Sequence, residues 1–81
     1  MVKVNGYYKQ GIDKKIFFKI IKISSNKCFV YYQMYDHKKV FDFGTKIFDM
    51  KCFDSWEKTG KLEKMTDEEK LVFDLVKDKN E

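Results

Sequence analysis

The sequence predicts one α+β domain, a small antiparallel β-meander or barrel of four to five strands followed by one C-terminal α-helix. Three observations predict it. The chain has only 81 residues, which is the size of a single small domain. Two runs rich in β-branched and aromatic residues are separated by a short polar cluster, which is typical of a hairpin. Near the end, apolar residues recur at helical spacing after a helix-start signal.

The two central strands are predicted at residues 16–23 and 28–35. The first reads IFFKIIKI and the second CFVYYQMY, and both compositions favour strands. Turn-prone residues 24–27 join the two runs, and a polar cluster at 36–39 ends the second. We therefore expect an antiparallel hairpin at the centre of the sheet.

Two further strands are predicted on either side of this hairpin in the chain. The third run covers residues 40–43 and continues after Gly44 to Met50. Its apolar positions change phase across the glycine, so a β-bulge is expected at Gly44. Upstream, residues 2–11 suggest a first strand that is kinked or interrupted by glycine.

A short helical turn is predicted at residues 54–60, after the β-rich basic part at 1–53. Asp54 is expected to cap its start, and Gly60 to end it in the left-handed conformation. Trp56, the single tryptophan, is expected to pack the final helix onto the sheet. Residues 61–65 then form a short extended piece.

The C-terminal helix is predicted over residues 66–78. Thr66 and Glu69 have the spacing of a capping box, in which each side chain satisfies a backbone N–H of the other residue. Charged residues occupy the opposite side of the predicted helix and are expected to be solvated, with no need of a partner. The apolar stripe consists of Leu71, Val72, Leu75 and Val76, with Phe73 beside them.

Both faces of the two central strands are apolar, which is not the pattern of a sheet exposed on one side. Either the sheet curls into a small barrel that the helix seals, or one face is an aromatic binding surface. In outline, the order of meander, short turn, strand and helix resembles the SH3-like barrels, including tudor-type domains and the small lysine-rich archaeal chromatin proteins. The resemblance is one of topology without a specific motif, so no binding residue is carried over from it.

Charge is divided unevenly along the chain. Residues 1–53 contain 11 lysines against 4 acidic residues, whereas residues 54–81 contain 6 lysines against 9 acidic residues. Two interpretations of the basic part stay open: lysines that contact phosphates beside stacking tyrosines, or lysine as the default solubilising residue of an AT-rich coding sequence. All 17 basic residues are lysine, and the lack of arginine disfavours base-specific readout.

The candidate binding residues are tyrosines and lysines of the basic β part. Neighbouring side chains on a strand point to opposite faces, so at least one ring of each tyrosine pair is expected at the surface. Exposed tyrosines with lysines suit both nucleic-acid and protein interfaces. The candidates are Tyr7, Tyr8, Lys19, Lys22, Tyr31, Tyr32, Tyr35, Lys38 and Lys39.

The sequence contains no pattern typical of a catalytic or metal site. Cys28 and Cys52 are expected to be reduced and largely buried, and His37 to be a solvated turn residue. A nucleophilic pairing of either thiol with His37 is the weaker alternative. The sequence has no close cysteine pair for zinc, no glycine-rich phosphate loop and no paired metal carboxylates. We therefore expect no enzyme, no metal and no cofactor.

Two functions follow as expectations from the sequence. The first is a small non-catalytic module, encoded by a phage or mobile element, that binds and modulates a host protein as anti-defence or anti-CRISPR inhibitors do. The alternative is a sequence-tolerant nucleic-acid-binding SH3-like protein that uses the lysine- and tyrosine-rich β face. We expect a cytoplasmic protein without a membrane partner, because no apolar run is long enough for a signal peptide or a span. An edge strand such as the first one is expected to be able to pair with a second copy into a homodimer.

Overall fold

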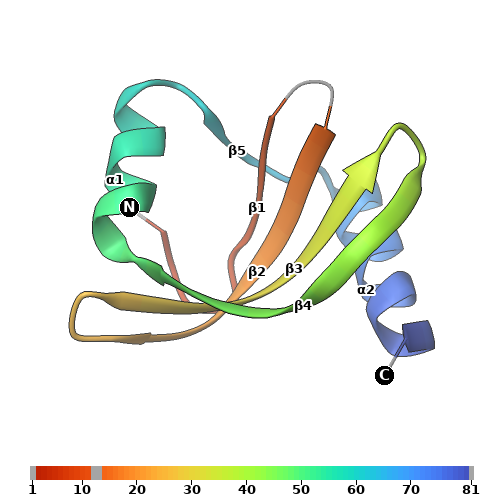
Figure 1. The fold of residues 1–81 in the computed structure, drawn as a ribbon, viewed down its shortest axis with the longest axis horizontal. Coiled ribbons are helices and arrows are strands. Elements are labelled where there is room, and N and C mark those ends of the chain that lie inside the picture. The colour runs from red at the N-terminus through yellow and green to blue at the C-terminus, as the bar shows by residue number, and fades with distance from the viewer. Residues whose placement is uncertain (1, 12–13, 81) are drawn as a thin grey trace.

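Five antiparallel strands and two helices follow one another along the chain (Figure 1). The computed structural model describes residues 2–11 and 14–80. The predicted α+β meander with a C-terminal helix is confirmed, and the extended piece after the first helix forms a fifth strand. The elements are β1 (Tyr7–Gln10), β2 (Lys14–Ser24), β3 (Lys27–Asp36), β4 (Lys39–Asp49), α1 (Met50–Lys58), β5 (Leu62–Lys64) and α2 (Asp67–Asn80).

The sheet is open, with the strand order β4-β3-β2-β1-β5. The predicted central hairpin is confirmed: β2 pairs with β3 along almost its whole length, ending at Ser24 opposite Lys27. The first strand is not the free edge that the sequence suggested, because β5 pairs with its outer side. The two edges are therefore β4, with 11 residues, and β5, with 3 residues.

The β-bulge predicted at Gly44 is wrong. Gly44 pairs regularly with Tyr32, and the extra residue of β4 is Phe41, whose two neighbours pair with consecutive residues of β3. The apolar phase changes along β4 for another reason: Phe43 points to the opposite side of the sheet from Phe48 and is 44% exposed. In the sequence, this exposed phenylalanine therefore produces the same change of apolar phase that a β-bulge would produce.

Each side of the sheet carries one helix, which explains why the central strands are apolar on both faces (Figure 1). The larger cluster lies on the side of α1, which we call the α1 side, and the smaller one lies under α2, on the α2 side. Neither closure into a barrel nor an uncovered aromatic face is needed. The buried members of the α1-side cluster are Val2, Tyr8, Phe18, Ile20, Cys28, Val30, Tyr32 and Phe53, and those of the α2-side cluster are Tyr31, Met65 and Phe73.

Helix α1 begins earlier than the helical turn predicted at 54–60. Asp49, not Asp54, is the N-cap, since its side chain accepts a hydrogen bond from the Lys51 backbone N–H at 3.3 Å. Gly60 follows the helix with φ +70°, the left-handed conformation predicted for it. Trp56 is a core residue as expected, but it packs α1 rather than the final helix onto the sheet, with its ring centroid 5.2 to 6.2 Å from those of Phe53, Phe48 and Phe18.

Candidate binding surface

Helix α2 contacts the sheet through one buried ring. Phe73 is 1% exposed, and its ring meets those of Tyr7 and Tyr31 edge-on at centroid distances of 5.8 and 5.5 Å. The capping box at the start of the helix is confirmed: the Thr66 backbone N–H donates to the Glu69 carboxylate at 2.8 Å, and the Glu69 N–H donates to the Thr66 hydroxyl at 3.2 Å. The cap therefore fixes where the helix starts, and Phe73 fixes which side of it faces the sheet.

Charged groups also join α2 to the sheet. The Lys9 ammonium donates to both oxygens of Glu69 at 2.8 and 2.9 Å, and the Tyr7 hydroxyl donates to Asp74 at 3.0 Å. Burial raises the pKa of the Glu69 carboxyl, but hydrogen bonds from Lys9 and from the Thr66 N–H outweigh it, so the pKa is lowered. The side of α2 that was expected to be solvated thus holds the helix in place.

A buried amide ties α2 to the central strand β3. Gln33 is fully buried, and its Nε2 donates to the backbone carbonyl of Phe73 at 2.9 Å. Its Oε1 accepts a hydrogen bond from the Tyr35 hydroxyl, also at 2.9 Å. Burial, and next the nearby Tyr31, raises the pKa of Tyr35, which keeps this hydroxyl a donor. Because a buried amide must be satisfied, this network favours one position of the helix on the sheet.

The apolar stripe of α2 points away from the sheet. Leu71 is 61% exposed, Leu75 is 60% exposed and Val72 is 46% exposed. The three residues lie within two turns of one helix, so they form a single ridge, which we call the α2 ridge. The amphipathic pattern in the sequence suggested that this side seals the sheet, and that expectation is wrong for these three residues. Their exposure is a feature that folding alone does not require.

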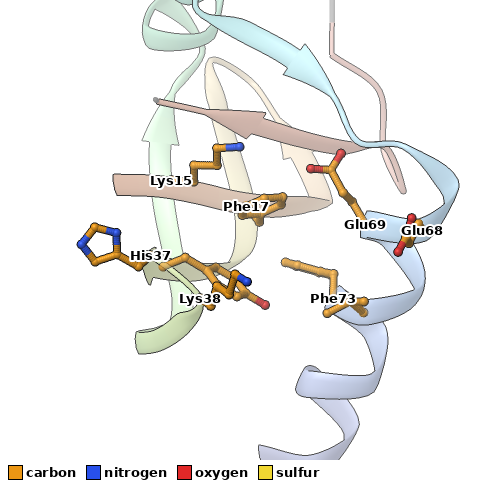
Figure 2. Close-up of a pocket in the computed structure, with 9 residues that line it drawn as sticks. Lys15, Phe17, His37, Lys38, Glu68, Glu69 and Phe73 are labelled. Atoms are coloured by element: carbon orange, nitrogen blue, oxygen red, sulfur yellow. The ribbon is translucent and has the colours of Figure 1, made fainter. Parts of the chain in front are cut away.

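A cleft of about 630 Å³ lies between the start of α2 and the adjoining ends of β2 and β3 (Figure 2). Phe17 and Phe73 both line it, and Glu68 and Glu69 project from the helix, whereas His37 extends away from the helix. Val72 belongs both to the wall of the cleft and to the α2 ridge, so the two surfaces are continuous. The lining residues are Lys15, Phe17, Tyr35, His37, Lys38, Glu68, Glu69, Val72 and Phe73.

The candidate tyrosines do not share one exposed face. Tyr8 and Tyr32 belong to the α1-side cluster, and Tyr31 is buried under α2, each with 7% or less of its surface exposed. Tyr7 and Tyr35 are half-buried and hydrogen-bonded on the α2 side. The expected surface ring is absent from the pair Tyr31–Tyr32, because α1 covers one side of β3 and α2 the other. The binding role of these five residues stays a prediction.

The candidate lysines are divided among three places on the fold. Lys19 places its ammonium 5.1 Å from the Tyr7 ring centroid, and Lys22 places its own 5.7 Å from that of Phe29. Lys38 lines the cleft, and Lys39 begins β4. A lysine ammonium above an aromatic ring is held within the fold by cation–π attraction, and it covers that face of the ring. The structure thus brings only Tyr35 and Lys38, of the nine candidates, into the cleft.

The thiol of Cys28 and the imidazole of His37, which the weaker catalytic alternative pairs, lie in different surroundings. Cys28 lies buried in the α1-side cluster with its Sγ 3.3 Å from the Met50 Sδ, whereas the His37 side chain is 91% exposed at the β3–β4 turn. Burial, and next the charge of Asp54, raises the pKa of the Cys28 thiol, which disfavours the thiolate. Among the residues that the structure describes, no three His, Cys, Asp or Glu side chains gather in a metal-binding arrangement.

Sequence reasoning missed the ridge, although one signal for it was present. Leu71, Val72, Phe73, Leu75 and Val76 are too many apolar residues for one narrow helix face, since successive positions differ by 100°. Because a single buried ring attaches the helix to the sheet, several of its other apolar side chains are not needed in the core. The number of apolar residues in this stretch, rather than their spacing, indicated a surface beyond the core.

Comparisons with protein-family models, with curated proteins and with solved structures find no match to this chain. Within residues 2–11 and 14–80, neither helix is long and apolar enough to cross a membrane.

Proposed function

We propose that the protein is a non-catalytic binding module whose α2 ridge and adjoining cleft dock a partner protein. The observation that supports this proposal is the outward orientation of Leu71, Val72 and Leu75. Contiguous apolar surface of this kind marks protein interfaces, because leaving it in water is unfavourable. Covering the exposed part of one such leucine contributes about 1–2 kcal/mol to binding.

The cleft defines the chemistry of the partner. Its floor is formed by Phe17, Tyr35 and Phe73, which suits one large apolar side chain inserted as an anchor. Lys15 and Lys38 stand at its sheet side, across from Glu68 and Glu69 on the helix, and they favour an acidic residue on the sheet side of that anchor. The AT-rich coding bias of the sequence favours a host protein as the source of such a segment.

The nucleic-acid alternative has less support from the tyrosines. Sequence-tolerant binders stack bases on exposed aromatic rings, whereas Tyr8, Tyr31 and Tyr32 are buried in this fold. The lysines still provide positive charge, so weak binding through phosphates alone stays a prediction of that alternative. It would fade steeply between low and physiological salt.

A matched pair of variants tests the docking surface. We expect the tagged protein to capture one stoichiometric protein from host extract, and Leu75→Ser to weaken this capture about tenfold. Val4→Ser is the control, because Val4 is also exposed, at 48%, but lies in the N-terminal segment. Equal capture by both variants would contradict docking on the ridge. Absence of any captured protein together with salt-sensitive DNA or RNA binding would favour the alternative.

A further inference from the structure

The edge strand β4 is unusually long and open. Its 11 residues form one margin of the sheet. Between Phe41 and Ile47, most side chains are exposed, and they lie on both faces of the sheet. Among the described residues, none of the backbone hydrogen bonds found outside the helices and the strand ladders involves residues 39–49. An exposed margin of this length presents unpaired N–H and C=O groups to another strand.

We propose that this margin pairs with a second copy of the chain, β4 to β4 and antiparallel, around a two-fold axis at Gly44. The strand reads KVFDFGTKIFD, and reversing its direction about the central glycine brings opposite charges together. Asp42 then lies opposite Lys46 of the second copy, and the symmetry makes this pair twice. Opposite charges directly across an antiparallel pair stabilise it, whereas like charges oppose it.

Apolar side chains match on the other side of the same strand. Phe43 pairs within the chain with Gln33, whose amide bonds α2, so Phe43 points to the α2 side. In the two-fold pair it lies opposite Thr45, and Phe41 lies opposite Ile47 of the second copy. Phe41 and Ile47 are 55% and 60% exposed in the single chain, so pairing removes apolar surface from water.

Moving the axis by one residue in either direction loses the match of charges. An axis moved to Phe43 places Asp42 opposite Gly44, and an axis moved to Thr45 places it opposite Phe48. Neither shift sets an aspartate of β4 against a lysine of β4. The register is therefore specified by the side chains, as it is in strands with distinct faces.

The features that protect sheet edges do not oppose this pairing. A bulge and a charged residue on an edge strand normally keep other strands away. The bulge residue Phe41 lies outside the central segment 42–46, and Lys46 meets an acidic partner rather than a lysine. The edge thus rejects unrelated strands while accepting its own copy.

Charge reversal with rescue tests the pairing by sedimentation of the purified full chain over a concentration series. We expect a monomer–dimer equilibrium that Asp42→Lys and Lys46→Asp each weaken about tenfold or more, because each places like charges opposite one another twice. The double variant restores opposite charges and is expected to restore dimerisation. Lys61→Asp, an exposed residue away from β4, changes the net charge as Lys46→Asp does and is expected to leave dimerisation unchanged.

Circular dichroism of each variant separates misfolding from lost pairing, because both residues also touch Tyr32. Asp42 accepts a hydrogen bond from the Tyr32 hydroxyl at 3.1 Å, and the Lys46 ammonium lies 4.7 Å from its ring centroid. A chain that stays monomeric up to about 1 mM would overturn the pairing. So would folded single variants that dimerise like the parent, or a folded double variant that stays monomeric. Dissociation by Leu75→Ser instead would place the dimer contact on the α2 ridge, against the pairing of β4.

Discussion

Replacing Phe73 by alanine distinguishes the observed orientation of α2 from the one that its apolar stripe suggests. Phe73 is 1% exposed and packs on two tyrosine rings, whereas Leu75, two positions later, is 60% exposed. If the stripe faced the sheet, Leu75→Ala would be the damaging change. In the observed orientation, Phe73→Ala removes the only fully buried ring of the helix.

The structure sets the expected size of each effect. A buried Phe→Ala substitution costs about 3–5 kcal/mol, because apolar contact is lost and a cavity remains. Full burial of a leucine contributes about 1.5–3 kcal/mol, so a side chain that is 60% exposed loses about 1 kcal/mol or less. A domain of 81 residues has a free energy of unfolding of about 4–12 kcal/mol. We therefore expect Phe73→Ala to remove much of the stability and Leu75→Ala little.

Urea unfolding followed by far-ultraviolet circular dichroism measures both variants on the same scale. If Phe73→Ala is too unstable to show a folded baseline, the milder Phe73→Leu provides a measurable midpoint. Comparable losses for Leu75→Ala and Phe73→Ala would refute the orientation. A larger loss for Leu75→Ala would reverse it.

Three further predictions concern the helix cap and the thiols. The pKa of the Glu69 carboxyl is lowered in the folded state, so the stability that the ionised carboxylate contributes is present above the pKa of the unfolded chain and is lost as the pH falls through the folded value. Glu69→Gln should therefore flatten the acid side of a profile of unfolding free energy against pH, and an unchanged slope would exclude the contacts of Glu69 with Lys9 and the cap as the source of that slope. Thr66→Ala should cost about 0.5–2 kcal/mol in urea unfolding by removing one half of the capping box, so a stability equal to the parent's would contradict the cap. In the folded protein, a thiol reagent should modify the half-buried Cys52 well before the buried Cys28, and denaturant should make the two rates equal. Equal modification rates without denaturant would argue against the burial of Cys28.

Local signals in the sequence were enough to place most of the elements. The capping box of Thr66 and Glu69 starts α2, and the polar clusters at 24–27 and 36–39 end the two central strands. These signals work because they depend on neighbouring residues alone: a side chain satisfies a nearby N–H, or a turn residue accepts a special backbone angle. The start of α1 escaped them because Asp49 and Asp54 are both suitable caps by type.

The candidate site could not be predicted in the same way. The tyrosines chosen as surface residues include Tyr31 and Tyr32, which are buried because helices cover opposite sides of β3. Which rings stay exposed depends on where segments distant in the chain come to lie. Composition marked the aromatic residues as important without assigning them to core or surface.

The sequence by itself determined an α+β meander, its central hairpin and a capped C-terminal helix, because the period and the punctuation of a chain are local properties. Only the tertiary structure decided which side of that helix faces the sheet and which strand is the long free edge. The helix is oriented by Phe73, Gln33 and the Lys9–Glu69 pair, whose partners lie 40 to 66 residues apart in the chain. Leu71 and Leu75 of α2, and Phe41 and Phe43 of β4, remain exposed because these long-range contacts already fill the space between the helix and the sheet.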